Sequence, residues 1–173
     1  MPRPVIRDGA VRPDDWTAVT LAQGEAPQSV ALPAGALLVP LALWQARRAE
    51  LLARPGPLGV RLETADDPAL LAADLPRLDL VAIHFPKFVD GRGYSIAWLL
   101  RRRLGFSGEL RAIGDVARDQ VFYLARSGFD AFQPREGKDP AGLVAALRDF
   151  TATYQSAADG RAPLFRRREL LQP

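Results

Sequence analysis

The densest group of chemically capable side chains lies in the stretch that runs from His84 to Tyr94. It contains the only histidine of the chain, one of its two lysines (Lys87), and then Asp90 and Arg92. An apolar run that predicts a buried strand precedes this stretch, and a helical pattern follows it. In parallel α/β sheets, ligands bind outside the carboxyl ends of strands, where such loops emerge. The sequence therefore predicts a functional loop over residues 84–94.

Two further loops carry polar side chains directly after a predicted strand. The second loop supplies Asp115, Arg118 and Gln120, and the third supplies Gln133 and Arg135. Because the carboxyl ends of parallel strands share one edge of a sheet, we expect the three loops to converge there. Cationic side chains beside helix N-termini suit a small anion such as phosphate, sulfate or carboxylate.

We expect catalytic roles for His84, Lys87 and Asp115, with His84 as a proton-bearing contact and Lys87 as an anion contact. The predicted ligand-binding residues are Asp90, Arg92, Tyr94, Arg118, Gln120, Gln133 and Arg135.

Each of these side chains also fits a purely structural role. A histidine at the end of a buried strand is often only a hydrogen-bonded residue, and Lys87 fits a surface cation. The glycines of Asp90-Gly-Arg-Gly93 suit a tight turn, and Asp115 suits a helix N-cap. Tyr94 fits a core or rim aromatic. The sequence leaves both interpretations open.

The absent residue types exclude several chemistries. The chain has no cysteine, so it holds no disulfide, no thiolate-bound zinc, no cysteine-ligated cluster and no cysteine nucleophile. A single histidine leaves little for a transition metal, and we predict no metal site. Neither a phosphate-binding loop nor a dinucleotide fingerprint occurs, so the sequence identifies no cofactor.

Composition predicts an ordinary globular protein. The 173 residues fit one domain, with 48% hydrophobic and 25% charged residues. The net charge is +3, and the triplets 101–103 and 166–168 predict a solvated helix face and a flexible tail rather than a nucleic-acid site. No apolar run reaches the ~20 residues that span a membrane, and no signal peptide is evident, so we expect a cytoplasmic protein.

The chain divides into an N-terminal arm (1–35), an α/β domain (36–155) and a basic tail (156–173). The arm contains a predicted hairpin around the turn at residues 7–9, and Trp16 is expected to anchor it. Predicted strands cover residues 36–39, 58–63, 78–83, 109–113 and 129–133. Predicted helices cover residues 40–53, 67–76, 95–104, about 117–127 and 140–154, the last with Leu143, Leu147, Phe150 and Tyr154 inward.

Strands that alternate with helices of this length predict right-handed βαβ units and a parallel sheet. Four to five strands fit a three-layer sandwich of flavodoxin-like type, with the 78–83 strand covered by helices on both faces. The alternative is half of a (β/α) barrel, completed by a partner subunit in a homo-oligomer. The local pattern is the same for both.

Several motifs together resemble one bacterial family. They are residues 85–95, Gly108-Glu-Leu-Arg-Ala-Ile-Gly-Asp-Val116, Asp119-Gln120 and Gly128-Phe-Asp-Ala-Phe132. The family is domain of unknown function 934, and the resemblance extends from the Asp8-Gly9 arm to about Tyr154. Its members are described as candidate oxidoreductases in sulfite reduction, which implies sulfate assimilation and cysteine biosynthesis. At Ser127 many members carry a cysteine, so this chain departs from any thiol chemistry there.

Three functional hypotheses follow. The first is an accessory protein that binds sulfite reductase or a small anionic metabolite at the 84–94 edge. The second is a half-barrel enzyme of lyase or aldolase type, with Lys87 as acid, base or amine nucleophile and Asp115 as its partner. The third is a protein–protein interaction module that acts through the arm and the tail.

Overall fold

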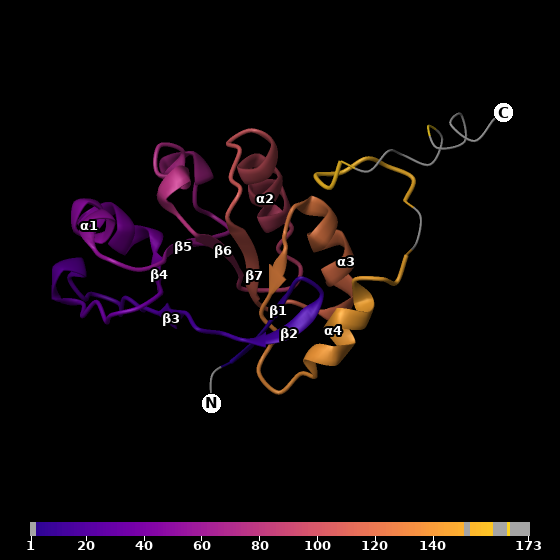
Figure 1. Ribbon diagram of the computed structural model, residues 1–173, viewed down its shortest axis with the longest axis horizontal. Helices are drawn as coiled ribbons and strands as arrows, with labels where there is room; N and C mark the ends of the chain where they lie inside the picture. Colours follow the sequence, from indigo (N-terminus) through magenta and orange to yellow (C-terminus); the bar gives the residue numbers. More distant parts are fainter. Residues whose placement is uncertain (1–2, 151–152, 161–165, 167–173) are drawn as a thin grey trace.

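The computed structural model describes residues 3–150, 153–160 and 166 (Figure 1). One sheet of eight strands, in the order β2-β1-β8-β7-β6-β5-β4-β3, forms the centre of the molecule. The strands are β1 (Pro4–Arg7), β2 (Ala10–Pro13), β3 (Thr17–Ala18), β4 (Leu37–Pro40), β5 (Leu58–Glu63), β6 (Leu80–Phe85), β7 (Glu109–Gly114) and β8 (Ala131–Phe132). The helices are α1 (Leu41–Ala53), α2 (Arg92–Arg102), α3 (Arg118–Ser127) and α4 (Pro140–Ala146).

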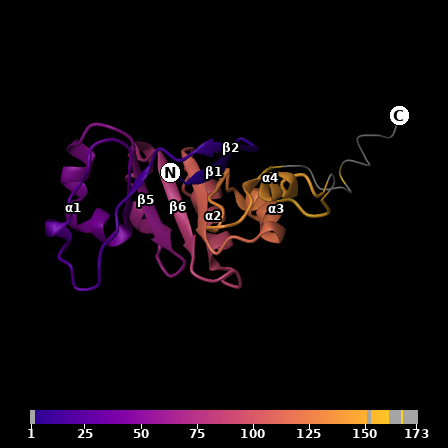
Figure 2. The same cartoon turned by 90° about the horizontal axis from the view of Figure 1, so that it is seen from below.

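Strands β3 to β8 lie side by side in chain order, and each is parallel to the next. Because every crossover moves in the same direction and is right-handed, all the helices fall on one face of the sheet. Figures 1 and 2 show α1 and α4 at opposite ends of this row of helices. The architecture is a curled half-barrel with the antiparallel hairpin β1–β2 added beside β8. The prediction of a flavodoxin-like sandwich is wrong, because the strand order never reverses; the half-barrel architecture of the alternative is confirmed.

The chain itself forces the sheet to curl. Strand β2 lies at one edge of the sheet and β3 at the other, yet only residues 14–16 separate them in sequence. A flat sheet of eight strands would be about 34 Å across at ~4.8 Å per strand spacing. An extended segment from residue 13 to residue 17 reaches only ~14 Å. The two edges must therefore approach each other, and residues 14–16 cross the concave face as a strap. We call this segment the strap below.

Side chains alternate between two different environments along the strands. On the convex face, Val60, Ile83 and Leu110 are fully buried beneath the helices in the main core. On the concave face, Leu80 and Ala82 belong to a smaller cluster, which Trp16 of the strap covers. The expectation that helices cover both faces of the 78–83 strand is therefore wrong. The hairpin and the anchoring by Trp16 are confirmed.

Two predicted helices differ from the structure. In place of the predicted helix 67–76 there are two 3₁₀ turns, η2 (Pro68–Leu71) and η3 (Leu75–Arg77). The last helix ends at Ala146 instead of about residue 154, and Phe150 and Tyr154 are exposed rather than inward. Most of the predicted tail, including 167 and 168 of the second arginine triplet, lies outside the described residues.

The first arginine triplet is only partly solvated. Arg102 and Arg103 are exposed, as expected. Arg101 instead donates to the carbonyls of Phe106, Gly108 and Gly128 at 2.7–2.9 Å and pairs with Asp130 at 2.5 Å. This arginine fastens the end of α2 to the loops around it. Within the described residues, no helix combines the length and apolar character needed to cross a membrane.

The close packing of α2 against β6 gives a stability test. A Cβ atom at Gly93 would lie 2.4 Å from the ring of Phe85, which is 1% exposed and has no room to move. We expect Gly93→Ala to lower the free energy of unfolding by about 1–3 kcal/mol in urea denaturation. Gly91→Ala, at the start of the same helix with no heavy atom within 4 Å, is the matched control and should change it little. Equal effects of both variants would contradict the packing.

Candidate functional site

The structure distributes the predicted site residues over three places. Asp115, Arg118 and Arg135 line a cavity at the carboxyl edge of β7 and β8. Asp90 and Arg92 form a small cluster with Thr64 beside β5. His84 and Gln133 face the concave side of the sheet and line a second cavity. Lys87 is exposed and lines neither of these cavities. The single rim expected from the sequence is therefore divided.

Two of the predicted residues hold the 86–91 loop in position. The backbone N–H of Phe88 donates to Asp115 at 3.1 Å, and the amide of Gln120 donates to the carbonyl of Phe88 at 2.6 Å. Asp115 also pairs with Arg135. The N-cap of α3 is Ala117, whose N–H donates to Gln120 at 3.1 Å, so Asp115 is not the helix cap that the sequence suggested. Tyr94 is half-buried with its ring edge against Phe85, and burial raises its pKa.

The Asp90 cluster is a compact charged turn. Arg92 donates two hydrogen bonds to the Asp90 carboxylate, at 2.9 and 2.7 Å, and the Thr64 hydroxyl donates a third at 2.5 Å. These hydrogen bonds, chiefly those from Arg92, hold the pKa of Asp90 well below its usual range. The arrangement satisfies both side chains internally.

The carboxyl-edge cavity has a volume of about 520 Å³. Its charged lining residues are Arg118, Arg135, Lys138, Asp115, Asp119 and Asp139. Cations and carboxylates are equal in number, and Arg118 is further paired with Asp149 at 3.0 Å. The walls therefore give no net attraction for an anion, although the sequence predicted an anion site at this edge.

His84 lies at the other side of the sheet. Its Nδ1 is 2.6 Å from the carboxylate of Glu63 on the adjacent strand β5. Its ring lies over Gly114, where a Cβ atom would be 2.7 Å from the ring and 2.4 Å from the carbonyl oxygen of Phe85. Gly114 also has φ +90°, which other residues rarely adopt. A glycine at the end of β7 therefore makes room for the histidine ring.

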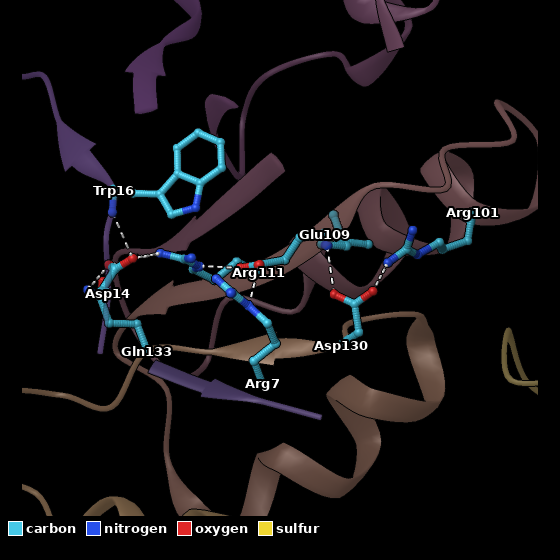
Figure 3. A network of polar contacts seen from close by, with 9 residues as sticks. Arg7, Asp14, Trp16, Arg101, Glu109, Arg111, Asp130 and Gln133 are labelled. Atoms are coloured by element: carbon cyan, nitrogen blue, oxygen red, sulfur yellow. Dashed lines mark hydrogen bonds and ion pairs between the residues drawn. The ribbon is translucent and has the colours of Figure 1, made fainter. Parts of the chain in front are cut away.

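Arg111, at the centre of β7, is the most unusual residue of the concave face (Figure 3). It is 1% exposed, its Nε donates to Glu109 at 2.7 Å, and its Nη1 donates to both oxygens of Asp14 at 2.9 Å. The Nη2 atom has no hydrogen-bond partner among the described residues. Asp14 belongs to the strap and also accepts from the backbone N–H of Trp16 and from Gln133. A buried donor is thus left free beneath the strap.

The concave cavity, between the strap and the sheet, has a volume of about 540 Å³. It is lined by Arg3, Asp14, Trp16, Ala18, Thr20, Leu38, Arg61, His84, Arg111, Ile113, Gly114 and Gln133. Three arginines and one carboxylate are among these residues. Glu63 and Glu109, which partner Arg61 and Arg111, lie outside the lining. Cations therefore outnumber carboxylates among the lining residues alone, and their numbers become equal when the paired Glu63 and Glu109 are counted.

The arginines of the concave face were missed by sequence reasoning. Their signal was the alternation of polar and apolar residues in Leu58-Gly-Val-Arg-Leu-Glu63 and Glu109-Leu-Arg-Ala-Ile113. Such alternation indicates a strand with one face free of the core, and polar side chains there can form a site. No sequence pattern around Asp14 marked it as a site residue, because only the folded structure brings it next to Arg111.

The chain belongs to a family of bacterial proteins of unknown function, DUF934, whose model matches residues 59–165. The matched region contains both Arg61 and Arg111. No curated protein and no solved structure matches the chain. Among the described residues, no group of three His, Cys, Asp or Glu side chains could hold a metal ion.

The Asp90 cluster predicts a specific dependence of stability on pH. A carboxylate with a lowered pKa in the folded state stabilises the protein above its unfolded pKa of ~3.9, and this contribution is lost as the pH falls below that value. We expect Asp90→Asn to be less stable than the wild type at pH 7 but to lose less stability between pH 4 and 2, as measured by urea midpoints. Asp15→Asn, at an exposed position, is the control with the same charge change. Parallel pH curves for Asp90→Asn and the wild type would contradict the role given to the cluster.

Proposed function

We propose that this protein binds a small oxyanion in the concave cavity and that it does so as an accessory protein of sulfite reduction in the cytoplasm. The single observation that carries the first part is the buried guanidinium of Arg111, a residue that lines the cavity and whose Nη2 donor is unused among the described residues.

Burying a charged group without satisfying its donors is costly. An unsatisfied buried donor costs about 1–3 kcal/mol, and more when the group is charged. Most such groups in folded proteins therefore have a partner. An anion in the cavity would give Arg111 the missing acceptor and would release this cost on binding.

Further donors surround the same place. The Nε of Arg61 is buried and lies 3.3 Å from Glu63 without a hydrogen bond to any described residue. Gln133 and His84 line the same cavity. Guanidinium groups present rigid pairs of N–H donors that match the oxygens of carboxylate and phosphate, and the same geometry suits sulfite and sulfate. These residues could share one oxyanion between β5 and β7.

The setting in sulfite reduction comes from the family resemblance. Sulfite and sulfate are both small oxyanions, so this setting and the chemistry of the cavity agree. Sulfite reductase is the partner that the setting implies. This part of the proposal is tested by whether the full chain co-purifies with sulfite reductase and whether its loss impairs growth on sulfate.

The enzymatic alternative has less support from the geometry. Lys87 would serve as an amine nucleophile only in a pocket that shields it from water. It is instead exposed, and it lines neither described cavity. The interaction-module alternative also has less support. Strands β1 and β2 of the arm are paired within the sheet and are not a free segment.

The oxyanion proposal predicts thermal stabilisation by the right anions. At 100 times its Kd, a ligand stabilises the native state by about 2.7 kcal/mol, which raises the Tm of a chain of this size by roughly 5–10 °C. We expect sulfite, sulfate or phosphate to produce such a rise relative to chloride at equal ionic strength. Arg61→Gln and Arg111→Lys should each remove most of it, the second because lysine keeps the charge but not the fork of donors.

The control is Arg103→Gln, which removes the same charge from an exposed position at the end of α2. It should retain the full rise. Arg61, whose side chain is 27% exposed, is less embedded than Arg111, so its variant is the safer test if Arg111→Lys unfolds. No rise with any oxyanion, or an equal rise in Arg61→Gln and the wild type, would refute binding at this cavity.

A further inference from the structure

The concave cavity is much larger than the oxyanion proposed to bind in it. Its volume is about 540 Å³, within the ~300–1,000 Å³ typical of sites for small organic molecules. One water molecule takes about 30 Å³ of liquid, and an oxyanion of four or five atoms takes only a few times more. An inorganic ion on Arg61 and Arg111 would leave most of the cavity filled with water.

The rest of the cavity is not lined like a site for a bare ion. Trp16, Leu38 and Ile113 contribute to its walls and belong to the small apolar cluster of the concave face. Trp16 is only partly buried in the described structure, so part of its indole remains uncovered. A ligand that covers apolar surface exposed to water in a cavity binds with a more favourable free energy.

The strap brings Trp16 to the cavity that Arg111 also lines. Asp14 accepts hydrogen bonds from Arg111 and from the backbone of Trp16, so a single carboxylate fixes both ends of the site (Figure 3). An aromatic side chain beside a cationic group is suited to a ligand that has an apolar part and an anionic part.

We infer that the ligand of the concave cavity is an organic oxyanion, such as a sulfonate, carboxylate or phosphate, whose apolar body packs against Trp16. This inference rests on the oxyanion site proposed above and adds the class of molecule that the site selects. The charged group binds near Arg61 and Arg111, and the apolar body fills the part of the cavity around Leu38 and Ile113.

A series of ligands with one charge and increasing apolar size tests the inference. The probes are methanesulfonate, benzenesulfonate and naphthalenesulfonate, and their binding to the full chain is measured by isothermal titration calorimetry. We expect the Kd to fall at least about tenfold from the first to the last, because the two fused rings of naphthalenesulfonate are covered by the wall. Naphthalenesulfonamide, which is neutral, should bind at least about tenfold more weakly than naphthalenesulfonate.

Two variants locate the apolar contact. Trp16→Leu should remove most of the gain between methanesulfonate and naphthalenesulfonate and leave the affinity for methanesulfonate nearly unchanged. Trp98→Leu, at an exposed tryptophan of α2, is the matched control and should keep the gain. Ala18→Leu places a larger side chain in the lining and should weaken naphthalenesulfonate selectively, which keeps the test available if Trp16→Leu fails to fold.

The outcomes separate this inference from the proposed function. If sulfate and all three sulfonates bind with equal affinity, the site is one for inorganic oxyanions and the inference is wrong while the proposed function remains. If naphthalenesulfonate keeps its gain in both Trp16→Leu and Ala18→Leu, the apolar contact lies elsewhere and the inference is wrong. If neither sulfate nor any sulfonate binds, the proposed function fails, and the inference fails with it.

Discussion

The ion pair between Asp14 and Arg111 connects the curl of the sheet with the candidate site. Three residues join the two edge strands, so the strap must cross the concave face, and Asp14 is where it is fastened to the central strands. Together with Glu109, this carboxylate compensates the charge of an arginine that is costly to bury in a protein interior. The same contact sets the roof of the concave cavity. Removing one partner would therefore affect both the shape of the molecule and the site.

The two cavities show why side-chain type alone does not identify a binding site. Both have volumes near 500 Å³, and arginines line both. At the carboxyl edge, cations and carboxylates are equal in number in the lining, and two of the carboxylates, Asp115 and Asp139, accept hydrogen bonds from backbone amides. In the concave cavity a buried donor remains unused. The distinction lies in which hydrogen bonds are already made, and this depends on the three-dimensional arrangement.

The sequence predicts local features of this protein better than global ones. The hairpin and the strands β4 to β8 could be predicted, because the residues that specify them lie within a few positions of one another. Strand order could not, since a sandwich and a half-barrel share the same alternation of strands and helices. The position of His84 on the concave face follows from its register on β6, where it alternates with Ile83 and Phe85 of the core. The role of Arg111 could not be predicted for another reason: its partner, Asp14, is 97 positions away in sequence.

That sequence separation has a consequence for how the chain folds. Strand β1 pairs with β8, and Ile6 lies opposite Phe132, so β1 finds this neighbour only after the strands between them in sequence have been made. Contacts between such distant segments form slowly, because the intervening chain must first be ordered. The hairpin and strap must therefore wait until the helix-covered strands have assembled. On this view the concave cavity is the last part of the molecule to be completed, and a nascent chain that stops before β8 lacks the strand beside which β1 pairs.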